Sequence, residues 1–178
     1  NYYRSCIRYL VFGNVLKNAT YPLSVSAERV SQATAIAAYV KKIGADFVAH
    51  GSTGAGNDQV RFDMIFNILI PETGIITPIR DLKLSREEEI EYLKKHGVEY
   101  NFEKAKYSIN KGLWGTSVGG KETLTSRQTL PEEAWPTPVT ETGSRDLELE
   151  FHEGELVGID GERLNPTPAI QKLQAVAQ

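Results

Sequence analysis

The first part of the chain places apolar residues at the three- and four-residue spacing of an amphipathic helix. This spacing predicts a helix over Ala27–Ile43, with Ser26 as its N-cap and Gly44 just after its last turn. The apolar stripe of this helix consists of Val30, Ala33, Ala37 and Val40. The regular spacing means that one face of the helix packs against a core.

Short apolar runs alternate with helical segments. Ala45–Ala49 predicts a buried strand that opens into the glycine-rich segment His50–Asp58. A helix over Gln59–Leu69 and a β-branched strand over Gly74–Pro78 follow, and a Ser-Arg-Glu-Glu capping box at 85–88 begins another helix. Helices that alternate with strands through short connections predict a parallel sheet, so the expected fold class is α/β.

The second half has a different pattern. Tyr107–Ser126 and Pro131–Gly143 are rich in Gly, Ser, Thr or Pro without helical or strand periodicity, and we expect loops there. Alternating apolar residues from Leu147, a Glu-Gly turn and the run Leu156–Ile159 predict an antiparallel hairpin. Thr167 is expected to cap a last helix with proline in its first position.

Composition excludes several classes of protein. The 178 residues include 20 Lys and Arg against 23 Asp and Glu, a formal net charge of −3, so clustered basic residues for nucleic acid or an anionic membrane are not expected. No apolar run approaches the ~18 residues of a membrane-spanning helix. The single cysteine, Cys6, cannot form an internal disulfide, so we expect a core thiol and a reducing, cytoplasmic location. The first residue is Asn1 rather than Met, and we expect the chain to begin inside a longer protein.

The glycine-rich segment is the best candidate for a ligand loop. Three glycines within six residues, at positions 51, 54 and 56, would let backbone N–H groups approach a ligand between a strand and a helix. The carboxyl ends of parallel strands are also where open α/β sheets bind ligands. A Walker phosphate loop is excluded, because Asn57 and Asp58 stand where its Lys and Ser or Thr would be.

The side chains after these glycines suit a free amino acid. Asp58 can hold an α-ammonium group, Arg61 can hold a carboxylate through two hydrogen bonds, and Asn57 offers both a donor and an acceptor. Asn57 and Arg61 lie four residues apart on one helix face, and Thr53 lies in the loop above them. The alternative is that Asn57 and Asp58 only cap the helix while Arg61 makes a surface ion pair.

Two other segments could surround a polar solute. Tyr107–Thr123 combines hydroxyl groups, glycines and Trp114, although an ordinary polar loop with Trp114 in the core has the same composition. Tyr21–Ser26 could contribute as well, or could be a turn before a helix cap. The three histidines lie far apart in the sequence and lack metal-ligand spacing, so no metal site is proposed.

Together, these segments resemble the argininosuccinate synthase family. The resemblance covers essentially the whole chain, with the segments in the order and spacing of the family. They are Tyr21–Ser26, His50–Asp63 (HGSTGAGNDQVRFD), Ile76–Lys83 (ITPIRDLK) and Tyr107–Thr123 (YSINKGLWGTSVGGKET). The most specific features are Gly-Asn-Asp-Gln-Val-Arg-Phe after a glycine loop and the downstream pair Ser108 and Ser117, nine residues apart.

The resemblance implies an ATP-dependent ligase of arginine biosynthesis. Such an enzyme joins citrulline and aspartate through a citrullyl-adenylate, with ATP and Mg as substrate and no redox cofactor, and releases AMP and pyrophosphate. The implied fold is a Rossmann-like parallel sheet of the adenine-nucleotide-hydrolase type. Residues 1–104 would form the C-terminal part of the nucleotide-binding domain, and residues 105–178 the first part of a synthetase domain that assembles into a homotetramer.

The family's binding residues carry over onto matching positions of this chain. Those expected to bind citrulline are Tyr21, Ser26, Asn57, Arg61, Ser108 and Ser117. Those expected to bind aspartate are Thr53, Asn57 and Asp58. Gly51 would lie against ATP, and no residue is assigned a catalytic role. Ala55 stands where the family often has Lys.

The family's N-terminal Ser-Gly-Gly-x-Asp pyrophosphate loop and its C-terminal segment do not occur in this chain. The resemblance therefore implies that the 178-residue polypeptide is inactive by itself, whereas its parent enzyme is active. Two alternatives remain: a non-catalytic amino-acid-binding or regulatory module, and another ligase of the ATP-pyrophosphatase type. The second would need a glutamine-hydrolysing nucleophile or a second cysteine, and the sequence shows neither.

Overall fold

The computed structural model describes residues 2–54, 56–99 and 107–177. The chain divides into two compact units, one formed by Ser26–Ala105 and the other by Asn1–Val25 together with Lys106–Gln178. Two positions singled out from the sequence lie outside the described residues: Ala55, which stands where the family often has Lys, and the expected domain boundary between residues 104 and 105.

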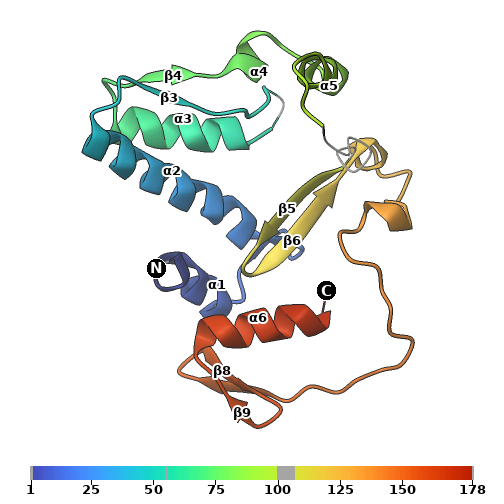
Figure 1. Cartoon of the computed structure of the whole chain (residues 1–178). Helices are drawn as coiled ribbons and strands as arrows, with labels where there is room; N and C mark the ends of the chain where they lie inside the picture. Colours follow the sequence, from blue (N-terminus) through green and yellow to red (C-terminus); the bar gives the residue numbers. More distant parts are fainter. Residues whose placement is uncertain (1, 55, 100–106, 178) are drawn as a thin grey trace. The chain divides into compact units, whose positions relative to one another are not determined.

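The unit Ser26–Ala105 is an α/β arrangement, as the alternating pattern predicts. Its elements are α2 (Leu23–Ile43, which begins just before the unit), β3 (Phe47–Ala49), α3 (Asp58–Leu69), β4 (Gly74–Ile76), α4 (Pro78–Asp81) and α5 (Arg86–Lys95). β3 and β4 pair in parallel, with Phe47 opposite Gly74 and Ala49 opposite Ile76. Figure 1 shows α3 alongside this strand pair and α2 beside α3. The predicted parallel pairing is therefore confirmed.

The core of this unit joins the two long helices to the strands. Its buried side chains are Ala33, Ala37, Val40, Val48, Phe66 and Ile70. The alanines let α2 approach closely, while Phe66, at 1% exposure, supplies the largest side chain of this cluster. Three of the four positions in the predicted stripe of α2 are therefore confirmed as core. The strand predicted over 45–49 is only half-buried, since Phe47 is 64% exposed.

Local signals set most helix ends in this unit. Gly44 takes a φ of +65° and ends α2, as predicted, and Gly97 takes a φ of +73° just after α5. Ser85 caps α5: its Oγ accepts the N–H of Glu88 at 3.2 Å, and Glu88 Oε2 accepts the N–H of Ser85 at 2.7 Å. The strand predicted over 74–78 ends at Ile76, because a proline at the next position but one starts α4.

The predicted start of α2 is wrong. Ser26 lies inside the helix, which begins at Leu23. The first turn is held by a distant contact, since the hydroxyl of the buried Ser24 donates to the carbonyl of Trp114, 90 residues away. That contact lies within the other unit, so no local pattern around Ser26 could indicate it.

The unit formed by the two chain ends is built from hairpins and helices. Its elements are the helical segment Tyr3–Ile7 with α1 (Arg8–Phe12), β1 (Leu16–Lys17), β2 (Tyr21–Pro22), β5 (Ser108–Gly112), β6 (Gly115–Gly119), the short turns Lys121–Leu124 and Glu132–Ala134, β7 (Leu149–His152), β8 (Glu155–Ile159), β9 (Glu162–Arg163) and α6 (Pro166–Ala177). The hairpin of β7 and β8 is confirmed. The main buried cluster of this unit consists of Ile7, Leu156, Ala169 and Ile170.

Two expectations for this unit are wrong. Tyr107–Ser126 is not a loop, since β5 and β6 pair antiparallel over five residue pairs. This hairpin depends on its main-chain ladder and on Gly115 at φ +120° rather than on alternating apolar side chains. The last helix starts at Pro166, so Thr167 is its second residue and not its cap.

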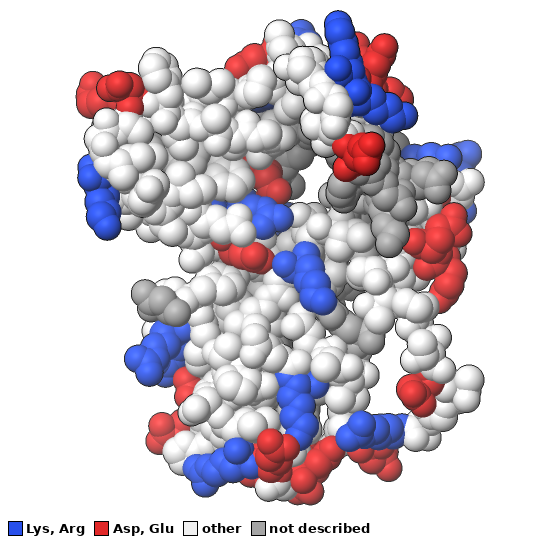
Figure 2. All heavy atoms as spheres, viewed as in Figure 1, with Lys and Arg blue, Asp and Glu red and all other residues white. Residues whose placement is uncertain are grey.

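The distribution of surface charge and the length of the helices bear on whether the chain could associate with a membrane. On the face drawn in Figure 2, acidic and basic side chains lie interspersed. In the part of the chain that the structure describes, no helix is long and apolar enough to span a membrane.

Phe66→Ala tests the importance of the core between α2, β3 and α3. We expect it to lower the free energy of unfolding by about 3–5 kcal/mol, because it leaves a cavity where a buried ring stood. Ile68→Ala is the matched control on the same helix: Ile68 is 67% exposed, and a change within about 0.5 kcal/mol is expected. Urea unfolding of both variants measures the difference, and equal losses would contradict this account of the core.

Candidate ligand-binding site

The glycine loop leaves β3 at the carboxyl edge of the parallel strand pair. The ladder extends one residue past β3, where the His50 N–H donates to the carbonyl of Ile76 at 3.1 Å. Gly51, Thr53, Gly54 and Gly56 are then exposed before α3 begins at Asp58. The predicted ligand loop is therefore open to solvent at the edge where sheets of this class bind ligands.

The fold does not require glycine at the three loop positions. None of them has a positive φ. A Cβ at Gly51 would meet nothing within 4 Å, and at Gly54 or Gly56 its nearest neighbour would lie at 3.7 Å, an ordinary contact. Gly74 in β4 is different, because a Cβ there would lie 2.6 Å from the ring of Phe47. Glycine in the loop thus leaves room on the exposed side of the backbone, where a ligand could approach.

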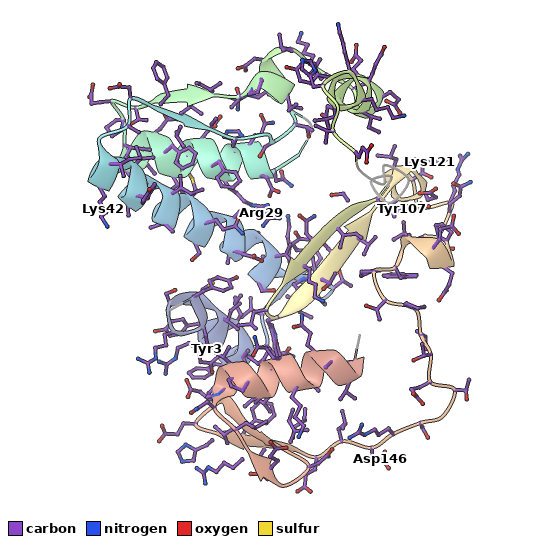
Figure 3. All side chains as sticks on the ribbon, in the orientation of Figure 1. Tyr3, Arg29, Lys42, Tyr107, Lys121 and Asp146 are labelled. Atoms are coloured by element: carbon purple, nitrogen blue, oxygen red, sulfur yellow. The ribbon has the colours of Figure 1, made fainter. Side chains whose placement is uncertain are left out.

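Asp58 and Arg61 lie together at the start of α3. Arg61 Nη1 donates to Asp58 Oδ1 at 2.7 Å, and Arg29 Nε, on α2, donates to Asp58 Oδ2 at 3.2 Å. Figure 3 labels Arg29 where it projects from α2. The ion pair that the alternative expects for Arg61 is therefore present, whereas the capping alternative for Asn57 is wrong: its side chain makes no capping hydrogen bond.

This arrangement fits a zwitterionic ligand. The Asp58 side chain is 34% exposed, so solvent weakens its ion pairs and a ligand can replace them at small cost. A ligand ammonium group would then take Asp58, and a ligand carboxylate would take the guanidinium released from it. The structure therefore brings the two predicted amino-acid-binding groups into one cluster.

Beneath the loop lies a second polar cluster. His50 Nδ1 accepts the N–H of Ser52 at 3.3 Å, so the neutral ring carries its proton on Nε2 and donates it to Asp63 Oδ1 at 2.9 Å. The His50 ring also stacks on Phe62, with centroids 5.4 Å apart. These contacts hold the first residues of the loop against α3.

Arg80, in α4, completes this cluster. It donates to Asp63, to Gln59 Oε1 at 3.3 Å and to Oγ1 of the buried Thr77 at 3.0 Å. Burial raises the pKa of Asp63, but hydrogen bonds from Arg80 and His50 outweigh it and leave that pKa below its ordinary value. Asp63 therefore stays ionised well into acid conditions.

The remaining predicted site residues divide between the two units. Tyr21 lies in β2, Ser108 and Ser117 lie in the β5–β6 hairpin, and Ser26 lies in α2. Asn110 pairs with Ser117 and is two residues from Ser108, so the two serines share one face of the hairpin. The nine-residue spacing of these serines thus has a structural reason that the expected loop did not provide.

Sequence reasoning missed several polar residues around the loop. Arg29 contacts Asp58; Gln59 and Asp63 contact the loop; and Arg80 contacts both Gln59 and Asp63. A signal was available, because polar residues follow both parallel strands and the carboxyl ends of such strands meet at one edge. Arg29 has no comparable sequence signal, since only the packing of α2 brings it to Asp58.

Two further observations concern metal-ligating side chains and the single thiol. Within residues 2–54, 56–99 and 107–177, no three His, Cys, Asp or Glu side chains are grouped as metal ligands. Cys6 is partly buried, and this burial raises the pKa of its thiol.

A parallel strand pair packed against helices, with an exposed glycine loop at its carboxyl edge, is an α/β arrangement of the class that binds ligands at that edge. Residues 2–99 match the family model described as the arginosuccinate synthase N-terminal HUP domain. The chain belongs to the argininosuccinate synthase family.

Individual relatives agree with this family. The argininosuccinate synthase of Methanocaldococcus jannaschii is 42% identical over 173 residues, which is 94% of this chain and 44% of the relative. That of Sulfurisphaera tokodaii is 39% identical over 171 residues, 96% of this chain and 44% of the relative. The chain therefore spans less than half the length of these relatives.

Asp63→Asn tests the charge of the lower cluster. Because the folded-state pKa of Asp63 is lowered, its ionised form stabilises the fold above the unfolded-state pKa of about 3.9, and this stabilisation is lost as pH falls through the folded-state pKa. Wild type should therefore exceed the variant in unfolding free energy at pH 7, and the difference should shrink below about pH 4. Urea unfolding between pH 7 and pH 2.5 measures this, and a difference that is independent of pH would contradict it.

Proposed function

We propose that this chain is the ligand-binding part of an argininosuccinate synthase. The reaction joins citrulline to aspartate with ATP and releases AMP and pyrophosphate. The observation that carries the proposal is the cluster of Asp58 and Arg61 beside a glycine loop whose glycines the fold does not need. Because the chain belongs to the argininosuccinate synthase family, the amino acids proposed for this cluster are citrulline and aspartate.

Each predicted residue has a role that suits its chemistry. Asp58 would hold the ammonium group of aspartate, with Thr53 and Asn57 completing that site. Arg61 would hold the citrulline carboxylate, and Gly51 would leave room for ATP. The other proposed citrulline contacts are Tyr21, Ser26, Asn57, Ser108 and Ser117.

The chemistry demands positioning more than proton transfer by these side chains. In the first step, the citrulline ureido oxygen attacks the α-phosphorus of ATP, and the bond to the bridging oxygen of pyrophosphate breaks. In the second, the aspartate amine, having lost a proton, attacks the ureido carbon and AMP leaves. Because charge develops on phosphate oxygens, alignment and electrostatic stabilisation carry most of the catalysis, with Mg neutralising ATP.

The proposal extends to the whole protein. Residues 1–104 would be the C-terminal part of a Rossmann-like nucleotide-binding domain and residues 105–178 the first part of a synthetase domain. The parallel pairing of β3 and β4 supports the first assignment. The complete enzyme would work in the cytoplasm, in arginine biosynthesis, as a homotetramer.

A chimaera tests the activity directly. This chain would replace the 173-residue segment that it matches in the M. jannaschii relative. The chimaera should form argininosuccinate from citrulline, aspartate and ATP. A folded chimaera that binds all three substrates without forming product would sink the proposal.

Arg61→Ala tests the carboxylate site in the 178-residue chain. Nuclear magnetic resonance titration of the labelled chain with L-citrulline should shift amide signals around α3, and the variant should bind at least about tenfold more weakly, which corresponds to about 1.4 kcal/mol. Arg145→Ala is the control, because it removes an exposed arginine paired with Asp160. Equal citrulline affinities for wild type and Arg61→Ala would show that the carboxylate lies elsewhere.

Gly51→Ala tests whether the loop reserves space for a ligand. A Cβ at Gly51 meets nothing within 4 Å, so the melting temperature should stay the same or rise slightly, while binding of ATP by the chimaera weakens severalfold. Gly74→Ala should instead lower the melting temperature, since its Cβ would lie 2.6 Å from the ring of Phe47. Unchanged ATP binding by Gly51→Ala would contradict the assigned role of this loop position.

A further inference from the structure

The side chain of Gln59 connects the glycine loop to the polar cluster beneath it. Its Nε2 donates to the carbonyl of Gly54 at 2.5 Å, and its Oε1 accepts from Arg80 Nη1 at 3.3 Å. A carbonyl can only accept and a guanidinium can only donate, so these two partners determine which way the carboxamide points. Gln59 is therefore oriented by its neighbours rather than free to turn.

The anchor of this connection is itself held on several sides. Arg80 also donates to Asp63 and to Thr77 Oγ1, and Asp63 accepts from His50, whose side chain is only 7% exposed. The loop is thus fixed at two points, through the Ser52 N–H to His50 and through the Gly54 carbonyl to Gln59. The glycines around these points are exposed and would otherwise have wide conformational freedom.

We propose that Gln59 is a positioning residue that holds the glycine loop in its ligand-binding conformation. Because the peptide unit is planar, holding the Gly54 carbonyl fixes the orientation of that peptide. A loop ordered in advance loses less conformational entropy when a ligand binds, so affinity rises without any contact between Gln59 and the ligand. The inference rests on the proposed function in one respect, that the loop binds the substrates.

Gln59→Glu separates positioning from folding. The carboxylate keeps the size of the side chain and still accepts from Arg80, but it cannot donate to the Gly54 carbonyl. We expect an unchanged melting temperature, backbone order parameters at Gly51–Gly54 that fall from about 0.85 to below about 0.6, and binding of L-citrulline and L-aspartate weakened at least about threefold. Gln59→Leu, which loses both hydrogen bonds, should have the same effects on the loop.

Gln174→Glu is the matched control. Gln174 Nε2 donates to the carbonyl of Gly112 at 3.0 Å, the same kind of contact in the other unit. This control should leave the order parameters at Gly51–Gly54 unchanged. If it loosens the loop as much as Gln59→Glu does, the effect is not specific and the proposal is overturned.

The outcomes distinguish this inference from the proposed function. If wild type binds neither amino acid, the proposed substrates are wrong, and the order parameters alone decide whether Gln59 holds the loop. If wild type binds them and Gln59→Glu binds equally well, Gln59 does not position the loop for binding. Order parameters that stay at the wild-type level in Gln59→Glu and Gln59→Leu would also overturn the proposal.

Discussion

The parallel pairing of β3 with β4 is the constraint on which the candidate site depends. Gly74 leaves room for the ring of Phe47 opposite it, since a Cβ at that position would lie 2.6 Å from this ring. Parallel strands end at the same edge, so the residues after β3 and after β4 emerge side by side. His50 therefore reaches Asp63, and Arg80 reaches the same carboxylate from the other strand's exit. The register of β3 and β4 therefore sets how closely His50 and Arg80 approach Asp63.

Two carboxylates near the loop are paired with arginine, but their surroundings give them different properties. Asp63 is held by both Arg80 and His50, which lower its pKa and bind three segments together. Asp58, at 34% exposure, is held by Arg29 and Arg61 at the edge of the helix, where water and ligands can compete. Asp63 is only slightly less exposed, at 26%, so the two carboxylates differ mainly in what they join: Asp63 connects the start of the loop, α3 and α4, whereas Asp58 connects α2 and α3.

The sequence predicted the elements whose signals are local. The capping box at Ser85, the stop at Gly44 and the stripe on α2 need only neighbouring residues, and the structure confirms them. The β5–β6 hairpin was missed because its Gly, Ser and Asn residues do not alternate in polarity, and its stability lies in main-chain pairing. The start of α2 was misplaced because the contact of Ser24 spans 90 residues.

The same distinction applies to the site. Asp58 and Arg61 were predictable because their three-residue spacing within one helix brings them together, whereas Arg29 reaches Asp58 only through the packing of α2.

The charges of this cluster also bear on its ligands. Two guanidinium groups and one carboxylate leave one positive charge among Arg29, Arg61 and Asp58. Citrulline is a zwitterion without net charge. If it replaced the ion pair between Arg61 and Asp58 with one ion pair to each, the net charge of the cluster would stay the same. The cluster would therefore have to select citrulline by geometry and hydrogen bonds. Aspartate carries one more negative charge and would neutralise the excess, as would an oxygen of a nucleotide phosphate. Because opposite charges attract over about 8–10 Å at physiological salt, this positive sum would favour an anionic partner beside a bound zwitterion.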